Sequence, residues 1–315
     1  MHILITGGAG FIGSHIIDHL LKNTQHKIRV VDNLFSGSLD NININLKKYS
    51  NRLEFIYGDV SNLEICRKAV KDIDLICHQA AVGSVPRSIK DPLTSHNSNV
   101  NGILNLLIAS KENKVKRIVY ASSSAVYGDE STLPKIENKI GNPMSPYAVT
   151  KVVQELYCNL FTQYYGIECI GLRYFNVFGP KQNPGGAYAA VIPKFIKLMK
   201  EGISPIINGD GSYSRDFTYI DNVVDANIKA LFTTNKKCNG EVFNIGAGGR
   251  TTILELFNIL KNELNFKKEP VLNSIREGDI PHSNANIKKA LDLLDWNPKI
   301  NTEEGLKLTL KLKQI

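Results

Sequence analysis

The chain has 315 residues, 43% hydrophobic and 22% charged, which is typical of a soluble globular protein with one or two domains. Lys and Arg total 38 against 30 Asp and Glu, a formal net charge of +8, but no basic stripe is interleaved with aromatic residues. The composition therefore argues against nucleic-acid binding.

Cysteine usage and the N-terminus bear on the cellular compartment. The five cysteines are odd in number and form no Cys-x-x-Cys pair, which indicates reduced thiols rather than a disulfide framework. Residues 1–6 have the pattern of a strand and lack the basic region and long apolar stretch of a signal peptide. No apolar run reaches the length of a membrane span. We therefore expect a cytoplasmic protein with no membrane partner.

Short apolar runs alternate with helical patterns through the first half of the chain. Predicted strands cover residues 2–6, 28–31, 53–57, 74–77, 117–122 and 168–174. The longest predicted helical segments lie at about 93–112 and 147–165. This alternation predicts an α/β fold with a doubly wound parallel (Rossmann) sheet and right-handed crossovers.

The composition of the sequence changes near residue 175. Beyond it, loops rich in Gly, Pro and Asn separate shorter predicted elements. We expect one domain over residues 1–174 and a smaller C-terminal α/β domain over 175–315. Segments of the second are expected to interleave with the first.

A glycine-rich loop, Gly7-x-x-Gly10-x-x-Gly13, directly follows the first predicted strand and opens a helix. Glycines allow a tight turn and a close approach of backbone amides to a pyrophosphate at the positive end of the helix. Asp32 follows Gly13 by 19 residues, at the end of the second strand. A carboxylate there accepts hydrogen bonds from an adenosine ribose and repels a 2′-phosphate, so the predicted cofactor is NAD rather than NADP.

Tyr147 and Lys151 are four residues apart on a predicted helix and therefore share one face. The pair alone is weak evidence, because ordinary amphipathic packing often produces it. Lowering a tyrosine pKa from about 10 to about 7 requires about 4 kcal/mol. One lysine charge about 6 Å away, at an effective dielectric constant of about 20, supplies about 3 kcal/mol. Lys151 alone is therefore slightly insufficient, and the positive nicotinamide ring of NAD is expected to supply the remainder.

The glycine loop and the Tyr-x-x-x-Lys motif resemble the extended short-chain dehydrogenase/reductase family, and the resemblance covers nearly the whole chain. Further motifs that carry it are His78-Gln79-Ala80-Ala81, residues 122–128 (SSSAVYG), residues 173–179 (RYFNVFG), Asn208-Gly209-Asp210-Gly211, Arg215-Asp216-Phe217 and Arg276-Glu277-Gly278-Asp279. Together these motifs look like those of NAD-dependent nucleotide-sugar 4-epimerases. Residues 83–88 (GSVPRS) and 185–190 (GGAYAA) most closely resemble the bacterial UDP-N-acetylglucosamine 4-epimerase subgroup.

The resemblance implies three catalytic residues. Ser123 would hydrogen-bond the hexose O4, while Tyr147 as phenolate, supported by Lys151, takes the O4 proton and C4 gives hydride to the nicotinamide. Related dehydratases carry an Asp-Glu pair, and related decarboxylases a Glu, where this chain has Ser124 and Ala125. Because neither residue can act as an acid or base, only hydride return remains, and return to the opposite face gives epimerisation at C4.

Further cofactor contacts are implied by the same resemblance. They are assigned to Phe11, Ile12, Asn33, Asp59, Val60, Gln79, Ala80, Ala81, Tyr147, Lys151 and Val177, in addition to the three glycines and Asp32.

For a UDP-sugar substrate, the resemblance assigns the diphosphate to Asn176, Arg215 and Arg276, and the uridine ribose to Asp279. Arginine suits phosphate because its planar fork donates two hydrogen bonds. Residues flanking the uracil would be Val191, Lys194 and Asn208, and further substrate contacts are expected from Ser84, Arg87, Ser123, Ser124 and Arg250.

Ser283 corresponds, by resemblance, to the residue beside the C2 substituent of the sugar. Epimerases restricted to UDP-glucose and UDP-galactose carry a tyrosine there, whereas a serine leaves room for an N-acetyl group. The expected activity is therefore a UDP-N-acetylglucosamine 4-epimerase. An epimerase of UDP-glucose or UDP-glucuronate remains an alternative, as does a non-catalytic NAD-binding sensor, although a sensor does not need Ser123, Tyr147 and Lys151.

Two further expectations concern partners. His15 and His19 lie at i, i+4 as metal ligands could, but no third ligand is near in sequence, so no metal site is expected. The family resemblance implies a homodimer formed through the helices near 93–112 and 147–165.

Overall fold

The computed structural model describes residues 1–185, 190–275 and 280–312. Its centre is a seven-stranded sheet in the order β11-β6-β5-β4-β1-β2-β3, with every neighbouring pair parallel. The strands are β1 His2–Thr6, β2 Lys27–Asp32, β3 Leu53–Tyr57, β4 Leu75–His78, β5 Arg117–Ser123, β6 Glu168–Tyr174 and β11 Val242–Ile245. The six predicted strands are confirmed to within one residue at each end.

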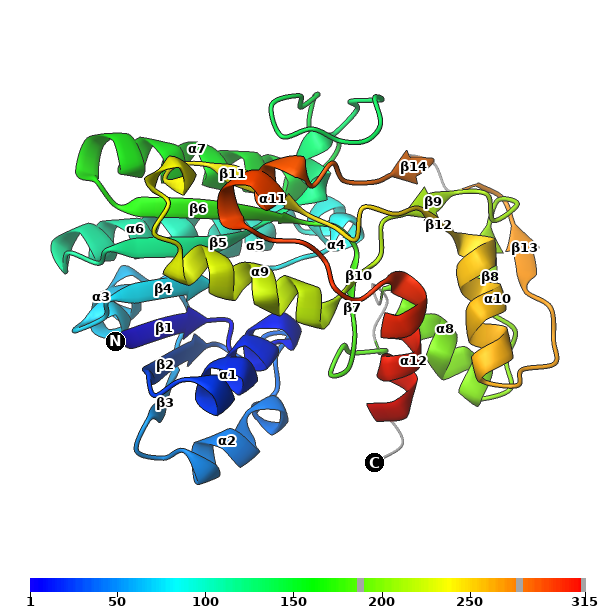
Figure 1. The fold of residues 1–315 in the computed structure, drawn as a ribbon, viewed down its shortest axis with the longest axis horizontal. Coiled ribbons are helices and arrows are strands. Elements are labelled where there is room, and N and C mark those ends of the chain that lie inside the picture. The colour runs from blue at the N-terminus through cyan, green and yellow to red at the C-terminus, as the bar shows by residue number, and fades with distance from the viewer. Residues whose placement is uncertain (186–189, 276–279, 313–315) are drawn as a thin grey trace.

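Helices cover both faces of this sheet, which confirms the doubly wound fold (Figure 1). One face carries α1 (Phe11–Asn23), α2 (Asn43–Lys48) and α9 (Ile220–Phe232), and the other carries α3 (Leu63–Val70), α6 (Gly102–Glu112) and α7 (Pro146–Tyr165). Alternate side chains of β1 serve the two faces, because Ile3 and Ile5 pack with α1 while Leu4 packs with α3 and α6. Burial on both faces explains why the strands are almost continuously apolar.

The helix α7 has local signals at both ends. Ser145 caps its N-terminus by accepting a hydrogen bond from the Ala148 N–H at 3.1 Å, and Pro146 occupies the first turn. Gly166 ends the helix in the left-handed conformation, with φ of +71°. Tyr147 and Lys151 therefore lie in the first turns of a helix whose start is set by sequence.

The long helix predicted near 93–112 is interrupted. It consists of α5 (Pro92–His96), a π-helical turn at Asn97–Asn101, and α6. Asn99 in this turn accepts a hydrogen bond from the Val82 N–H at 2.8 Å and donates one to the Thr150 hydroxyl of α7 at 3.0 Å. The π-turn thus joins the loop after β4 to α7.

The second half of the chain forms small sheets and helices beside the large sheet. Its strands are β7 Val177–Phe178, β8 Ile206–Asn208, β9 Ser214–Arg215, β10 Thr218–Tyr219, β12 Thr251–Thr252, β13 Val271–Asn273 and β14 His282–Ser283. Its helices, other than α9, are α8 Val191–Lys200, α10 Ile253–Glu263, α11 Lys288–Leu294 and α12 Thr302–Leu312, while the short α4 (Val85–Lys90) belongs to the first half.

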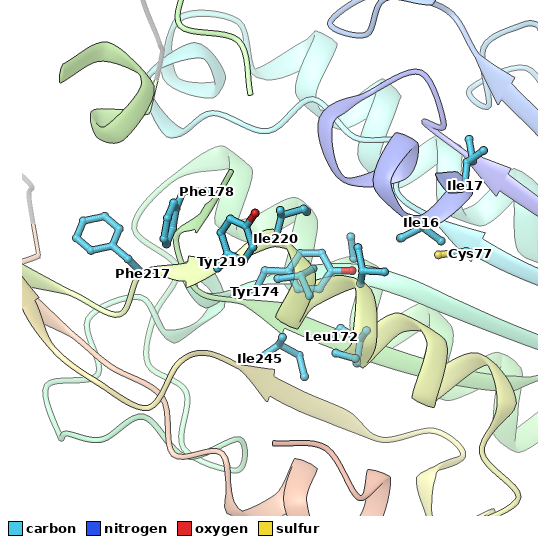
Figure 2. Packing of buried hydrophobic residues seen from close by; sticks show 14 of the residues in the cluster. Ile16, Ile17, Cys77, Leu172, Tyr174, Phe178, Phe217, Tyr219, Ile220 and Ile245 are labelled. Carbon is cyan, nitrogen blue, oxygen red and sulfur yellow. The ribbon is translucent and has the colours of Figure 1, made fainter. Parts of the chain in front are cut away.

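One apolar core runs through both halves. Figure 2 shows Ile16, Cys77 and Leu172 beside the large sheet in the same cluster as Phe178 and Tyr219. The Phe178 and Tyr219 rings, on the paired strands β7 and β10, lie 5.7 Å apart. The chain also returns to the large sheet after residue 175, in α9 and β11. The boundary between 1–174 and 175–315 therefore remains a prediction.

Two observations bear on the compartment. All five cysteines are free and buried. In the described parts of the chain, no helix is long and apolar enough to cross a bilayer.

Candidate active site

The three predicted catalytic residues converge at the C-terminal end of β5. Ser123 is the last residue of β5, and its hydroxyl lies close enough to Tyr147, at the start of α7, to act on the pKa of that phenol. The Lys151 Nζ lies 5.9 Å from the centroid of the Tyr147 ring. The structure therefore brings together the triad that the sequence predicted.

The electrostatics of the triad differ in one respect from the expectation. Burial raises the pKa of Tyr147, and the hydrogen bond from Ser123 only partly offsets this effect. The Lys151 Nζ donates to the Ala121 carbonyl at 2.7 Å and to the Gln154 amide oxygen at 3.0 Å. Its charge is thus shared with two oxygens beneath the site. The pKa of Tyr147 therefore stays above its ordinary value. Lys151 does not supply the lowering that its distance from the phenol predicts.

Lys151 itself is 2% exposed. Burial lowers the pKa of this lysine to about 8, against an opposing contribution from the nearby Glu155 carboxylate. Its ammonium therefore remains mostly charged at neutral pH.

A buried ion pair supports α7 directly below Lys151. The Arg173 guanidinium of β6 donates to both oxygens of Glu155, at 2.9 and 2.7 Å. Ser122 of β5 donates to the same carboxylate at 2.5 Å, and Arg173 stacks over the Tyr127 ring at 5.0 Å. Because Arg173 and Glu155 are 3% and 11% exposed, this fork joins three elements in a region of low dielectric constant.

A cavity of about 310 Å³ lies over the C-terminal edge of the sheet, between the glycine loop and the ends of β2 and β4. The predicted cofactor residues that line it are Gly7, Gly10, Phe11, Ile12, Gly13, Asp32, Asn33, Asp59, Val60, Gln79, Ala80 and Ala81. At one end it reaches Gly83, where an added Cβ would lie 4.0 Å from the Tyr147 hydroxyl. The cavity therefore leads to the triad.

The glycine loop fits a dinucleotide. Gly7 has φ of +68°, and a Cβ there would lie 2.6 Å from the Ala80 nitrogen. A Cβ on Gly13 would lie 2.3 Å from the Gly7 carbonyl oxygen. These glycines let the loop close tightly over the first turn of α1, which carries no acidic residue and whose N–H groups suit a pyrophosphate.

Two backbone N–H groups hold the Asp32 carboxylate at the end of β2. Its carboxylate accepts hydrogen bonds from the Ala9 N–H at 3.0 Å and the Leu34 N–H at 2.8 Å, which leaves lone pairs for a ligand. Burial raises the pKa of this carboxyl, and the two backbone hydrogen bonds oppose that effect. Its position fits the adenosine ribose of NAD.

Gln79, at the base of the cavity, is positioned by a buried polar network. Its amide donates to the Asn227 side-chain oxygen at 3.0 Å, and the Tyr174 hydroxyl donates to its oxygen at 3.2 Å. Asn227 comes from α9 and Tyr174 from β6, so distant segments fix a residue of the cofactor cavity.

Some cavity residues were missed from sequence, namely Val31, Phe35, Ser36, Gly58, Val82, Gly83 and Ser98. Phe35 and Ser36 directly continue the Asp32-Asn33 segment and could have been found by extending it. Ser98 comes from the π-helical turn, for which we find no local sequence signal. Conversely, three predicted cofactor contacts are not among the lining residues: Val177, which lies in β7 and pairs with Thr218, and the catalytic pair Tyr147 and Lys151.

Three of the predicted substrate residues meet on a small sheet. In the order β12-β9-β14, Ser283 of β14 is in register with Arg215 of β9, and Thr251 of β12 opposes Arg215 from the other side. Arg250 precedes β12, and its Nε donates to the Ser214 hydroxyl at 3.1 Å. Arg215 and Ser283 are thus cross-strand neighbours, and Arg250 is held beside them through the hydroxyl of Ser214.

The buried Asp216 ties this surface together, although sequence reasoning gave it no role. It is 1% exposed, and its carboxylate accepts hydrogen bonds from the backbone N–H groups of Ala247 at 2.6 Å, Gly248 at 3.1 Å and Ala285 at 3.1 Å. It joins the segments that carry Arg250 and Ser283 to Arg215. Burial raises the pKa of Asp216 to about 6, and the three hydrogen bonds oppose the shift.

The remaining predicted substrate residues lie on separate elements. Val191 and Lys194 are in the first turn of α8, and Asn208 ends β8. Asn176 has φ of +30° and donates to the Asp216 carbonyl at 3.4 Å.

Three further predicted substrate residues lie near the triad or the cavity, and two lie outside the described residues. Ser84 caps α4, Arg87 stacks over the cavity residue Phe35 at 5.2 Å, and Ser124 begins a 3₁₀ turn after Ser123. Arg276 and Asp279 lie outside the described residues.

The histidine pair of α1 was not expected to bind a metal. His15 Nδ1 lies 2.9 Å from the Phe11 carbonyl, and burial lowers the pKa of the ring. Among the described residues, no group of three or more His, Cys, Asp or Glu side chains could hold a metal ion.

Comparison with known proteins gives consistent matches along the chain. The model of the NAD dependent epimerase/dehydratase family matches residues 3–246. A relative from Methanocaldococcus jannaschii, provisionally named a UDP-glucose 4-epimerase, is 42% identical over 307 residues, or 97% of this chain and 96% of the relative.

Two solved structures align with this chain at a TM-score of 0.92. Each alignment covers 100% of this chain and 99% of the chain in the solved structure. One is the UDP-glucose 4-epimerase of Thermotoga maritima with UDP-glucose, at 37% identity. The other is the UDP-N-acetylglucosamine 4-epimerase of Methanobrevibacter ruminantium with UDP-N-acetylmuramic acid, at 40% identity.

Asp216 should make stability depend on pH. Its pKa of about 6 lies above the ordinary 3.8, so the folded chain binds this proton more tightly than the unfolded chain does. The stability that this proton contributes is full below about pH 4 and is lost as pH rises through about 6, a change of about 3 kcal/mol. Asp216→Asn should remove this slope from urea unfolding curves measured between pH 5 and 7.

Asp210→Asn is the control for this experiment. Hydrogen bonds from Ser212 lower the pKa of the Asp210 carboxyl, so this variant should keep the wild-type slope between pH 5 and 7. Equal slopes for wild type and Asp216→Asn would contradict the assignment.

Proposed function

Because the chain belongs to the NAD dependent epimerase/dehydratase family, we propose that it epimerises UDP-hexoses at C4, with UDP-N-acetylglucosamine and UDP-N-acetylgalactosamine as its substrates. The observation that carries the proposal is the convergence of Ser123, Tyr147 and Lys151 at the end of the dinucleotide cavity. The fit of the glycine loop and Asp32 supports NAD as the cofactor.

The chain supplies the proton carrier, Tyr147, although its own groups leave the pKa of this phenol raised and the positive nicotinamide ring of bound NAD would have to lower it. NAD, when bound, supplies reversible hydride acceptance. Ser123 orients the hexose O4 by hydrogen bonding, Tyr147 takes the O4 proton and later returns it, and Lys151 holds positive charge beside the phenol. Ser124 and Ala125, which follow on the 3₁₀ turn, offer no second acid or base. Epimerisation therefore fits better than dehydration or decarboxylation.

The small sheet β12-β9-β14 supports the choice of substrate. Arg215 and Arg250 provide cations for a diphosphate, and the small Ser283 stands in register with Arg215. A serine there leaves space for a C2 acetamido group. The similarity to the Methanobrevibacter ruminantium enzyme supports the acetylated pair, while the similarity to enzymes named for UDP-glucose keeps that substrate, and UDP-glucuronate, as alternatives.

We further propose a homodimer formed through α7 and the neighbouring α5 and α6. Val149, Leu156, Leu160 and Tyr164 are 47%, 60%, 45% and 76% exposed and recur along one face of α7. An apolar helix face of this kind is typical of a subunit interface.

Tyr147→Phe tests the mechanism. Loss of the phenol hydroxyl should lower epimerase kcat by about 100-fold or more, the usual contribution of a general base. NAD should stay bound, because the glycine loop, Asp32 and the other residues that line the cavity are unchanged. Turnover is measured by NMR of the sugar mixture and bound NAD by its release on denaturation.

Tyr57→Phe is the control, since this tyrosine is 68% exposed and lies on β3, outside both the triad and the proposed dimer face. Unchanged turnover in Tyr147→Phe would refute the mechanism. If the wild type binds NAD but converts no UDP-sugar, the result would favour the alternative of a non-catalytic NAD-binding sensor.

Ser283→Tyr tests the sugar specificity. A tyrosine beside Arg215 should fill the space for the acetamido group and shift the ratio of kcat/KM toward UDP-glucose by about 100-fold. Separate incubations with UDP-N-acetylglucosamine and UDP-glucose give the ratio, with Ser283→Ala as a control that preserves the space. A wild type that converts only the unacetylated pair would show that the Ser283 argument is wrong.

Leu156→Glu tests the dimer. A charge in the centre of the exposed α7 face should convert a dimer into monomers in light scattering. Leu291→Glu changes a leucine that is 47% exposed on α11 and should leave the dimer intact. A wild-type protein that is monomeric at assay concentrations would contradict the proposal.

A further inference from the structure

Lys181 adopts a backbone conformation that L-residues rarely occupy. Its φ is +62°, in the left-handed region, and it lies in the segment that joins β7 to α8. Such a conformation persists in a non-glycine residue when surrounding contacts compensate for its cost, and it frequently marks a functional position. The contacts made by the Lys181 side chain therefore need an explanation.

The ammonium group of Lys181 reaches back to the first half of the chain. Its Nζ donates to the Asp18 carboxylate of α1 at 2.9 Å and to the Asn41 carbonyl at 3.1 Å. Lys181 and Asp18 are 27% and 26% exposed, so solvent screens this pair less than it screens a fully exposed one. Asp18 is also held from the other side by the Asn45 amide.

Asn41 connects this contact to the glycine loop. Its side-chain amide donates to the Ala9 carbonyl at 2.8 Å, and the Ser38 N–H donates to the same oxygen at 3.0 Å. The N–H of Ala9 in turn donates to Asp32 at 3.0 Å. The residue whose carbonyl binds Lys181 therefore also holds the middle of the loop that fits the pyrophosphate.

On its other side, the segment of Lys181 is joined to a residue proposed to bind the substrate. The next residue, Gln182, donates to the Val177 carbonyl of β7 at 3.1 Å. Val177 directly follows Asn176, which is proposed to bind the diphosphate and donates to the Asp216 carbonyl at 3.4 Å. A hydrogen-bonded path thus leads from the Lys181 segment to Asn176.

We propose that Lys181 is a positioning residue that couples the two nucleotide sites, because its ammonium ties the segment after β7, which is braced next to Asn176, to Asp18 and to the Asn41 that holds the glycine loop. The inference rests on the proposed UDP-sugar function. NAD bound at the glycine loop would hold Asn41 and Lys181 in place, and Lys181 in turn would hold Asn176 for the diphosphate. By linkage, UDP then raises the affinity for NAD by the same factor by which NAD raises the affinity for UDP, and slower release of NAD is the expected consequence.

The test measures NAD release from the holoenzyme with and without saturating UDP. In the wild type UDP should slow NAD release by about fivefold or more, the lower end of typical coupling. In Lys181→Gln the two rates should agree within about twofold, while Lys181→Arg, which keeps a cationic donor, restores the difference. Lys181→Gln should also raise KM for the UDP-sugar more than it lowers kcat, since Ser123, Tyr147 and Lys151 are untouched.

Two further variants make the result specific. Lys200 lines a surface hollow together with Lys181 and Asn41. Lys200→Gln removes a positive charge from this hollow but leaves the contacts of Lys181 with Asp18 and Asn41 in place, so coupling should persist. Asp18→Asn should weaken coupling as Lys181→Gln does, and the double variant should show no further loss. If Lys181→Gln folds poorly, Asp18→Asn tests the same contact.

The proposal is overturned if UDP does not slow NAD release in the wild type, or if Lys181→Gln keeps the full effect. Epimerase turnover is recorded on the same samples. An active wild type without coupling refutes only the role of Lys181, whereas an inactive wild type refutes the proposed function.

Discussion

The buried fork between Arg173 and Glu155 is the constraint on which the arrangement of the triad depends. Two charges almost inaccessible to water are tolerated only when they are paired and hydrogen-bonded, and here both carboxylate oxygens are occupied. The pair fixes α7 on β6, and Ser122 fixes it on β5. With α7 in that register, Lys151 enters the interior and Tyr147 meets Ser123 at the edge of the sheet.

Two opposing effects act on the pKa of the buried Lys151. Burial lowers its pKa, while the Glu155 carboxylate one turn later counteracts this effect. The same carboxylate that holds the helix therefore also keeps the ammonium charged beside Tyr147. Structural support and electrostatic tuning are functions of one residue.

In the second half of the molecule, backbone N–H groups satisfy another buried carboxyl group. Asp216 accepts three backbone N–H bonds, and these gather segments that are far apart in sequence beneath Arg215 and Ser283. A shared apolar core through Phe178 and Tyr219 joins this region to the large sheet. The proposed substrate surface and the cofactor cavity therefore share one continuous core, and the contacts of Lys181 with Asp18 and Asn41 add a polar link between the segment after β7 and the first half of the chain.

The sequence by itself determined the parallel sheet, the glycine loop, Asp32 and the Tyr147–Lys151 pair, because each depends on spacing within a single strand, turn or helix. It also predicted Ser123, whose position at a strand end follows from the strand. Only the tertiary structure decided that β11 completes the sheet, that Ser98 and Gly83 line the cavity, and that Asp216 and Lys181 join distant segments. These features depend on contacts between residues tens to more than a hundred positions apart, whose partners leave no periodicity or local motif in the chain. The pKa of Tyr147 belongs to the same class, since burial raises it and the Ser123 hydroxyl opposes that effect, and neither influence is encoded in a spacing of four.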